Sequence, residues 1–331
     1  MGEGKYMKAE KKISVVVPCY NEEDVILEFY HELHRIMAER LQMAEYEILF
    51  VDDGSKDASA GIMKELSKKD EHVEFISFSR NFGKESAIYA GLQFAEGDYT
   101  VIMDADLQHP PEVIVRMYEE MQSGSYDMIA TRRKDRLTDT KLRSFGAQLF
   151  YKIMNKISGI NMGNHAMDFR MLNGKAKRAI LSMGEYNRFS KGIFEWVGFR
   201  TCWLEIEIPD RKAGKSKWSL MKLFHYSLEG CMAFSTLPLA LSSLIGFALC
   251  LIAVFMIIVM ILQTIVTGVE GSGYATIICT ILLVGGVQLF CIGILGQYLA
   301  KAYLEVKQRP KFLVQNLSEK KRNIYDRDLL V

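Results

Sequence analysis

This chain of 331 residues has few prolines and no closely spaced pair of cysteines. Only 6 prolines occur and 49% of the residues are apolar, a composition that excludes disordered and collagen-like chains. The six cysteines form no Cys-x-x-Cys pair, and no histidine lies at metal-ligand spacing from them. Neither a disulfide framework nor a zinc site is indicated, so we expect a folded chain with reduced thiols.

Glycine-rich phosphate loops are absent as well. The sequence contains neither Gly-x-x-x-x-Gly-Lys-Ser/Thr nor Gly-x-Gly-x-x-Gly. ATP cleavage in a P-loop and dinucleotide redox chemistry both depend on such loops, so both are excluded.

Charge is missing from two stretches near the C-terminal end. Neither Gly230–Val269 nor Gly271–Ala300 contains Asp, Glu, Lys or Arg, and Glu270 alone separates them. A bilayer core about 30 Å thick is crossed by about 20 apolar helical residues, fewer than either stretch contains. We predict a transmembrane hairpin within 230–300, with helices over 237–266 and 275–299. Two buried helices of a soluble core are the alternative.

Basic residues flank both predicted spans, while the turn between the spans has none. The positive-inside rule therefore places residues 1–229 and a basic tail over 301–331 on the cytoplasmic side of the plasma (inner) membrane. The flanking residues are Arg211, Lys212, Lys215, Lys217 and Lys222 before the first span, and Lys301, Lys307, Arg309 and Lys311 after the second.

Short apolar runs alternate with helical patterns between residues 13 and 131. Runs of Val, Ile and Phe that are each reached through a helix are typical of a parallel sheet covered on both faces. Ligands of such sheets bind beyond the carboxyl ends of the strands. We predict strands over 13–19, 47–51, 74–78, 99–103 and 127–131, and helices over 22–40, 57–69, 84–95 and 111–123.

Polar clusters follow four of these predicted strands, at residues 18–22, 52–55, 79–84 and 104–108. Each has a plainer interpretation by itself. Asn21 and Asp57 suit helix N-caps, Asp53-Gly54 suits a turn, and Asp104-Ala105-Asp106 suits a solvated strand end. Four such coincidences on one sheet edge are much rarer than one, so we interpret that edge as a binding site.

The Asp-x-Asp pair is the most specific of the four clusters. Side chains at i and i+2 near a strand end can point to the same side. Two hard carboxylates there suit Mg²⁺ or Mn²⁺ and leave coordination positions for phosphate oxygens. We predict that Asp104 and Asp106 hold such a metal against a diphosphate.

The composition changes after the fifth predicted strand. Between Arg132 and Lys156, eight basic residues stand against two acidic ones and interleave with apolar residues at roughly helical spacing. This pattern predicts amphipathic interfacial helices over 137–158 and, before the first span, over 219–235. Nucleic acid is the alternative partner, but the bilayer anchor favours lipid phosphate, and we predict no nucleic-acid binding.

Three sequence runs resemble the family 2 glycosyltransferases of GT-A fold. The runs are Val16–Glu22 (VVPCYNE), Val51–Ser55 (VDDGS) and Asp104–Glu112 (DADLQHPPE). They are most similar to the polyprenyl-phosphate glycosyltransferases, which include dolichyl-phosphate mannose synthases and bactoprenol glucosyltransferases. The likeness extends over nearly the whole chain, because the bactoprenol branch also ends in two membrane helices. It implies a Rossmann-like, mostly parallel α/β domain and a homo-oligomer, by resemblance a tetramer.

The resemblance also implies a nucleotide-sugar site. His109 stands where mannose synthases often carry Asp, which weakens an assignment to mannose. By their match to the family motifs, the residues that hold the nucleoside are Pro18, Tyr20, Glu22 and Asp53, and the same site includes Lys84 and Ala105. The match also implies that Asp104 and Asp106 bind donor and metal, with Gln108 as a further candidate metal ligand.

An acceptor site is implied in the same way. Arg132, with Arg133, matches the family's phosphate-contacting arginine after the fifth strand, and guanidinium groups suit phosphate. Asp168 matches an acceptor-site Asp that is often proposed as the base. A phosphate monoester is already mostly dianionic at neutral pH, so electrostatic shaping would serve equally well. Asp106, Arg132 and Asp168 are thus the predicted catalytic residues, while Arg170, Arg211, Lys215 and Lys217 either contact phosphate or anchor the chain at the membrane.

The implied reaction is metal-dependent, inverting transfer of a hexose, foremost glucose from UDP-glucose, to undecaprenyl phosphate for cell-envelope glycan modification. UDP-galactose, UDP-GlcNAc or GDP-mannose as donor, and a non-catalytic membrane-anchored nucleotide-sugar scaffold, are the alternatives. A processive polysaccharide synthase would carry Gln-x-x-Arg-Trp and more spans, and the sequence has neither.

Overall fold

The computed structural model describes residues 11–41, 44–133, 166–207, 237–267 and 273–328. They belong to two compact units. The first unit combines the residues up to Ser219 with those from Pro310 onward, and the second covers Leu220–Arg309. The second unit is therefore an insertion in the sequence of the first. The predicted amphipathic segments 137–158 and 219–235 lie outside the described residues.

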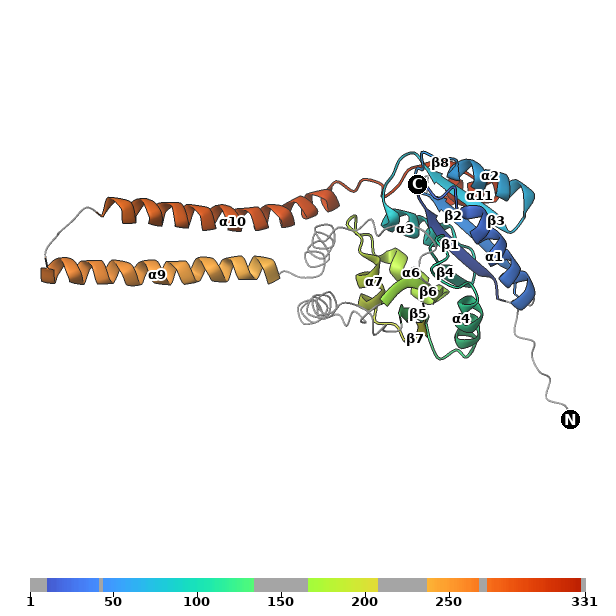
Figure 1. Cartoon of the computed structure of the whole chain (residues 1–331), viewed down its shortest axis with the longest axis horizontal. Helices are drawn as coiled ribbons and strands as arrows, with labels where there is room; N and C mark the ends of the chain where they lie inside the picture. Colours follow the sequence, from blue (N-terminus) through green and yellow to red (C-terminus); the bar gives the residue numbers. More distant parts are fainter. Residues whose placement is uncertain (1–10, 42–43, 134–165, 208–236, 268–272, 329–331) are drawn as a thin grey trace. The chain divides into compact units, whose positions relative to one another are not determined.

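An eight-stranded sheet forms the centre of the first unit (Figure 1). Its strand order is β7-β5-β6-β4-β1-β2-β3-β8. β6 runs antiparallel to β4 and β5, and β8 runs antiparallel to β3, whereas the other pairs are parallel. The strands are β1 (Ile13–Cys19), β2 (Tyr46–Asp52), β3 (Val73–Phe78), β4 (Tyr99–Ile102), β5 (Met128–Arg133), β6 (Ala166–Asn173), β7 (Thr201–Ile206) and β8 (Val314–Leu317).

Apolar side chains on both faces of the strands explain why helices cover both sides of the sheet. In β1, Val15 and Val17 pack into the core on one face, while Val16 packs into the core on the other. Helices α1 (Ile26–Arg40), α2 (Ser59–Lys69) and α4 (Val113–Gln122) cover the first face, and α3 (Lys84–Phe94) and α11 (Glu319–Asp328) cover the second. Two further helices, α6 (Gly174–Ser182) and α7 (Ser190–Trp196), contact β6.

The packing of α3 on β1 depends on a small residue. A Cβ added to Gly91 of α3 would lie 2.1 Å from Cγ1 of Val16, so the helix can approach the sheet this closely only without a side chain there. This close approach positions the N-terminal end of α3, and with it Lys84, at the carboxyl edge of the parallel strands.

The mostly parallel α/β architecture and the five predicted strands are confirmed. Three strands were not predicted. β6 lies between β4 and β5 in the sheet and is antiparallel to both. Its first residues therefore lie at the edge where β4 and β5 end. β7 extends the sheet beside β5, and β8 covers the opposite edge beside β3.

The C-terminal segment is folded onto the first unit, where the sequence analysis predicted only a basic tail. β8 pairs with β3, and the Phe312 ring stacks on Phe78 at a centroid distance of 5.0 Å. Tyr325 of α11 stacks on Phe94 of α3 at 6.3 Å. These contacts join residues more than two hundred positions apart in the chain, so no local pattern could indicate them.

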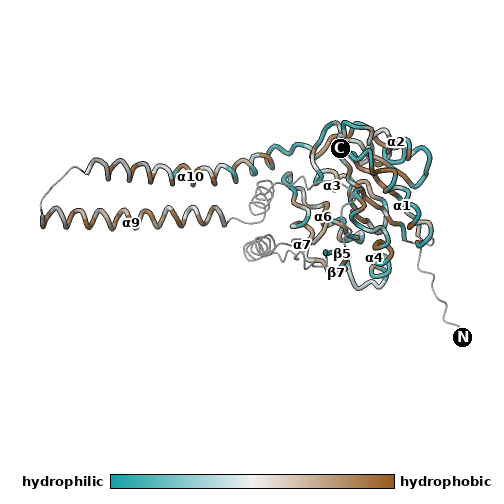
Figure 2. The backbone as a smooth tube through the Cα atoms, in the orientation of Figure 1, coloured by the Kyte–Doolittle hydropathy of each residue, from teal (hydrophilic) through white to brown (hydrophobic). Residues whose placement is uncertain are grey.

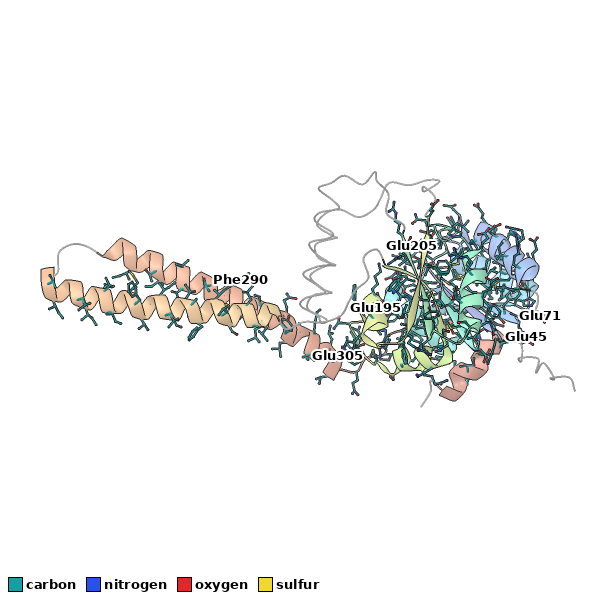
Figure 3. The ribbon with its side chains drawn as sticks, turned by 90° about the horizontal axis from the view of Figure 1, so that it is seen from below. Glu45, Glu71, Glu195, Glu205, Phe290 and Glu305 are labelled. Carbon is teal, nitrogen blue, oxygen red and sulfur yellow. The ribbon has the colours of Figure 1, made fainter. Side chains whose placement is uncertain are left out.

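The second unit is a pair of long helices, α9 (Leu237–Thr267) and α10 (Tyr274–Val306), that lie side by side (Figure 1). Windows of 24 residues with mean hydropathy 3.2 and 1.7 make both helices long and apolar enough to cross a membrane. Brown, the colour of apolar residues, is prominent along α9 and recurs at intervals along α10 in Figure 2. Large side chains such as Phe290, labelled in Figure 3, are mostly exposed, which a soluble core helix would not allow. α10 runs past the predicted end at residue 299 to Val306.

Candidate active site

A cavity of about 430 Å³ lies at the carboxyl ends of β1, β2 and β4. All eight residues predicted to bind the nucleotide sugar line this one cavity, and their individual roles stay predictions. Four further residues line the cavity, and three of them, Cys19, Asn81 and Gly83, belong to the polar clusters that follow the first and third strands. The lining residues are Pro18, Cys19, Tyr20, Glu22, Asp53, Asn81, Gly83, Lys84, Ala87, Asp104, Ala105 and Asp106.

Asn21 links two loops of the cavity rim. Its backbone N–H donates to Ser55 Oγ at 2.9 Å, and its Oδ1 accepts from the backbone N–H of Lys56 at 2.9 Å. Helix α1 begins only at Ile26, so the interpretation of Asn21 as an N-cap is wrong. Asp57 does bond to the start of a helix, because its Oδ1 accepts from the N–H of Ser59, the first residue of α2.

Asp53 holds the loop that leads into α3. Its buried carboxylate accepts hydrogen bonds from the backbone N–H groups of Phe82, at 2.7 Å, and Gly83, at 2.9 Å. Burial raises the pKa of the Asp53 carboxyl, and the two N–H groups offset part of that rise. The next residue, Gly54, has a φ of +66°, and a Cβ there would lie 2.3 Å from the carbonyl carbon of Arg80. The Asp53-Gly54 pair is therefore needed to bring the 80–83 loop against β2.

Lys84 connects the Asp-x-Asp pair with the predicted acceptor-site Asp. Its Nζ lies 2.7 Å from Oδ1 of Asp104 and 2.9 Å from Oδ2 of Asp168. Desolvation alone would lower the pKa of the Lys84 ammonium, but the charges of Asp168 and Asp104 outweigh it and raise that pKa above its ordinary value. Lys84 is therefore a permanent cation between two carboxylates that would otherwise repel each other.

Asp168 reaches this position through the direction of β6. Because β6 is antiparallel to β4, its third residue lies at the same edge of the sheet as Asp104. Desolvation would raise the pKa of Asp168, but the charges of Lys84 and Lys191 lower it to about 2. Asp168 is thus ionised throughout the neutral range and is a weak proton acceptor.

The Asp168→Asn variant tests whether this residue sets the pH dependence. A pKa of about 2 means that Asp168 loses its charge only as the pH falls far below neutrality, so it contributes no titration between pH 5 and 9. For the phosphate-monoester acceptor that the family resemblance implies, we expect Asp168→Asn to lower kcat while the acid limb of the pH–rate profile stays at the second pKa of that phosphate, about 6. Loss of that limb in the variant would show instead that Asp168 is the titrating base.

Asp104 and Asp106 both line the cavity, as the Asp-x-Asp spacing predicted. Oδ1 of Asp106 accepts from the backbone N–H of Gln108 at 3.1 Å, and Leu107 between them adopts a φ of +55°. In the described part of the chain, no third His, Cys, Asp or Glu completes a metal-binding group. Mg²⁺ and Mn²⁺ commonly use one or two carboxylates, with water and phosphate oxygens as the other ligands, so the donor set fits. Gln108 offers its N–H to Asp106 and does not line the cavity.

His109 is packed behind the Asp-x-Asp turn. Its ring is buried and stacks on Phe169 of β6 with the centroids 5.1 Å apart. Burial lowers the pKa of His109, so the ring is neutral at pH 7. It therefore supports the turn as a packed, uncharged group.

The predicted acceptor residues are placed differently from one another. Arg132 is the last residue but one of β5 and pairs with Glu205 of β7 at 2.6 Å, while Arg133, the last residue, is half-buried. Arg170 is fully buried, and its guanidinium lies 3.8 Å from the ring centroid of Phe194 in α7. Burial lowers the pKa of Arg170 to about 10. The structure thus places Arg170 in the packing beneath the site, away from any surface a phosphate could reach. Arg211, Lys215 and Lys217 lie outside the described residues.

Comparison with known proteins identifies the family. Residues 14–181, which include every strand end of the cavity, match the model of glycosyl transferase family 2. The chain belongs to glycosyl transferase family 2. This glycosyltransferase is 41% identical over 308 residues to the prophage bactoprenol glucosyl transferase homolog of Escherichia coli K12, covering 93% of this chain and 100% of that protein. It is 42% identical over 309 residues to the bactoprenol glucosyl transferase of Shigella phage SfV, with coverage of 93% and 100%.

Solved structures are more distant from this glycosyltransferase. The glucosyl-3-phosphoglycerate synthase of Mycobacterium tuberculosis, solved with Mn²⁺, UDP-glucose and phosphoglyceric acid, aligns with a TM-score of 0.46 and 14% identity. The alignment covers 67% of this chain and 78% of that one.

Proposed function

We propose that this glycosyltransferase transfers glucose from UDP-glucose to undecaprenyl phosphate (bactoprenol phosphate). The observation that supports the proposal most is the similarity to bactoprenol glucosyl transferases along nearly the whole chain, at 41% and 42% identity over 93% of its length. The cavity supports it independently, because it gathers the eight predicted nucleotide-sugar residues around the Asp-x-Asp pair. The two apolar helices suit an enzyme whose acceptor is a membrane lipid.

The proposed chemistry is one displacement at the anomeric carbon. An oxygen of the acceptor phosphate forms a bond to that carbon, the bond to the UDP oxygen breaks, and UDP leaves with the electron pair. The acceptor enters as a dianion, so no proton needs to be removed. A single displacement inverts the anomeric configuration.

The chain's own residues would position and neutralise the reacting groups. Asp104 and Asp106 would hold Mg²⁺ or Mn²⁺, which when bound stabilises the negative charge of the departing diphosphate. Lys84 would keep Asp104 and Asp168 at fixed positions, since it contacts both. Asp168, ionised and beside the donor pocket, would shape the electric field at the anomeric carbon.

The topology of the chain supports a cytoplasmic location for the active site. Residues up to Ser219 and from Pro310 onward belong to one folded unit, which supports a helix pair with both ends on the same side of the membrane. The basic residues at both ends then favour the cytoplasmic side of the plasma membrane. The homo-oligomer remains a prediction from the family resemblance.

A transfer assay with the purified full-length protein tests the function. Labelled UDP-glucose, UDP-galactose, UDP-GlcNAc or GDP-mannose is incubated with undecaprenyl phosphate, and the label that enters the organic phase is counted. We expect label from UDP-glucose only, complete loss after EDTA, and recovery with Mg²⁺ or Mn²⁺. A donor that binds without any transfer would instead support the non-catalytic scaffold, and activity that survives EDTA would contradict the metal role.

A further inference from the structure

The proposed reaction brings an anion toward a site that is already rich in carboxylates. Asp104, Asp106 and Asp168 all lie at the edge where the acceptor phosphate must approach. Like charges at close range repel, so a cation must offset the approaching phosphate. Lys84 is already engaged by Asp104 and Asp168. Arg132 pairs with Glu205, and Arg170 is buried under Phe194.

Lys84, Lys191 and Arg170 are described cations whose charges lower the pKa of Asp168. Of these three, Lys191 in the first turn of α7 is the one that is neither engaged by two carboxylates nor fully buried. Among the charges that lower the pKa of the Asp168 carboxyl, that of Lys191 has the second largest effect, after that of Lys84. The side chain is partly exposed, and within the described residues it forms no ion pair of its own. Nothing in the sequence motifs had pointed to it.

The packing of α7 on β6 explains why Lys191 lies beside Asp168. Residues two apart on a strand share a face, as do residues three apart on a helix. Asp168 and Arg170 therefore form one pair on β6, and Lys191 and Phe194 form the matching pair on α7. The stacking of Arg170 on Phe194 holds the two elements against each other, and the charge of Lys191 acts on Asp168.

A second contact fixes the start of α7 to the start of α3. The carboxylate of Glu85 accepts from the backbone N–H of Ser190 at 2.9 Å and also from the hydroxyl of Ser190. Lys84 precedes Glu85 and Lys191 follows Ser190, so the two lysines flank one hydrogen-bonded pair. Lys84 contacts Asp104 and Asp168, and the charge of Lys191 acts on the same Asp168.

We propose that Lys191 binds the phosphate monoester of the lipid acceptor and offsets its charge during transfer. The proposal rests on the proposed glucosyl transfer to a polyprenyl phosphate. It assigns Lys84 to the donor side and Lys191 to the acceptor side of Asp168, so that the two substrates meet across one carboxylate. The ammonium of Lys191 acts by charge and hydrogen bonding, and it takes up no proton in the reaction.

Steady-state kinetics of Lys191→Met, Lys191→Arg and Lys64→Met test this assignment. Lys64 is an exposed lysine on α2 outside the cavity, so its variant controls for the loss of one positive charge. For Lys191→Met we expect the acceptor KM to rise about tenfold or more, with the donor KM within about twofold of the wild type. Lys191→Arg should restore most of the acceptor affinity, and Lys64→Met should behave as the wild type.

Three results would overturn the proposal. They are an unchanged acceptor KM, a rise in the donor KM instead, or a loss of acceptor affinity that is explained by a lowered thermal midpoint of the variant. If the wild type itself transfers no sugar, the proposed function fails, and the lysine is then tested by binding alone. Calorimetry with a short-chain polyprenyl phosphate should give weaker binding to Lys191→Met than to the wild type. Equal affinities would reject the role of Lys191 separately from that of the enzyme.

Discussion

Asp106→Ala should reduce glucosyl transfer by about a thousandfold while the protein still folds and inserts normally. Asp106 is exposed at the cavity, and among the described residues its side chain accepts one hydrogen bond, from the exposed backbone N–H of Gln108, so its removal should leave the fold intact. In the proposed reaction it holds the divalent ion that stabilises the departing diphosphate. Loss of a group that stabilises developing charge costs about two to three orders of magnitude in kcat. The measurement is label transferred from UDP-glucose to the lipid phase.

Glu119→Ala is the matched control for this variant. Glu119 is an exposed carboxylate on α4 that does not line the cavity, so its removal changes the net charge equally without touching the site. We expect full transfer activity in Glu119→Ala and an unchanged thermal midpoint in both variants. Substantial transfer by Asp106→Ala with Mg²⁺ or Mn²⁺ present would remove Asp106 from the metal site.

Lys321→Met should lower the free energy of unfolding of the first unit by up to about 3–5 kcal/mol. It removes the closer of two cationic partners of the buried Glu47 carboxylate and leaves Lys12, whose Nζ lies 3.7 Å away. The Lys321 side chain is fully buried, and its Nζ lies 2.8 Å from Oε2 of Glu47 and 2.9 Å from Oε2 of Glu96. Desolvation alone would raise the pKa of the buried Glu47 carboxyl, and Lys321 is the main charge that lowers it. The midpoint of thermal unfolding of the detergent-solubilised protein measures the effect.

Two companion variants sharpen this prediction. Lys320→Met removes the neighbouring, largely exposed lysine, whose Nζ lies 3.5 Å from Oε1 of the buried Glu74, and should lower the midpoint much less than Lys321→Met. Adding Glu47→Gln to Lys321→Met removes the buried carboxylate charge that has lost its closer cation, and should recover part of the lost stability. Equal midpoints for Lys320→Met and Lys321→Met would mean that the buried pair contributes nothing to folding.

The Lys321 contact also bears on catalysis. α11, which carries Lys321, packs on α3, and the N-terminal residue of α3 is Lys84 at the Asp-x-Asp pair. β8 adds a strand beside β3, which leads into the loop that Asp53 holds. The segment after the two apolar helices therefore completes the folded unit that contains the active site.

Much of the donor side was predictable because its signals are local. Buried parallel strands read as short apolar runs, and the polar residues after each run must meet at one edge. The residues after β1, β2 and β4 line one cavity, as this rule requires. The apolar helices were equally predictable, since a long stretch without charge leaves few other structures open to the chain.

The acceptor side was less predictable, because it depends on pairings between distant segments. Asp168 lies near Asp104 only because β6 runs backwards between β4 and β5. Arg170, two residues further along β6, had looked like a phosphate ligand but is buried against Phe194. Lys191 gave no sequence signal, because its position depends on how α7 packs.

The sequence by itself determined the strand-helix alternation, the Asp-x-Asp pair with its neighbouring loops, and the two long apolar helices. Each of these features depends on residues that are close together in the chain. Only the tertiary structure decided which charges face one another across Asp168, and that residues 310–328 return to complete the sheet. Strand direction and helix packing bring together groups far apart in the chain, and their energies depend on distance in space, which residue order does not contain.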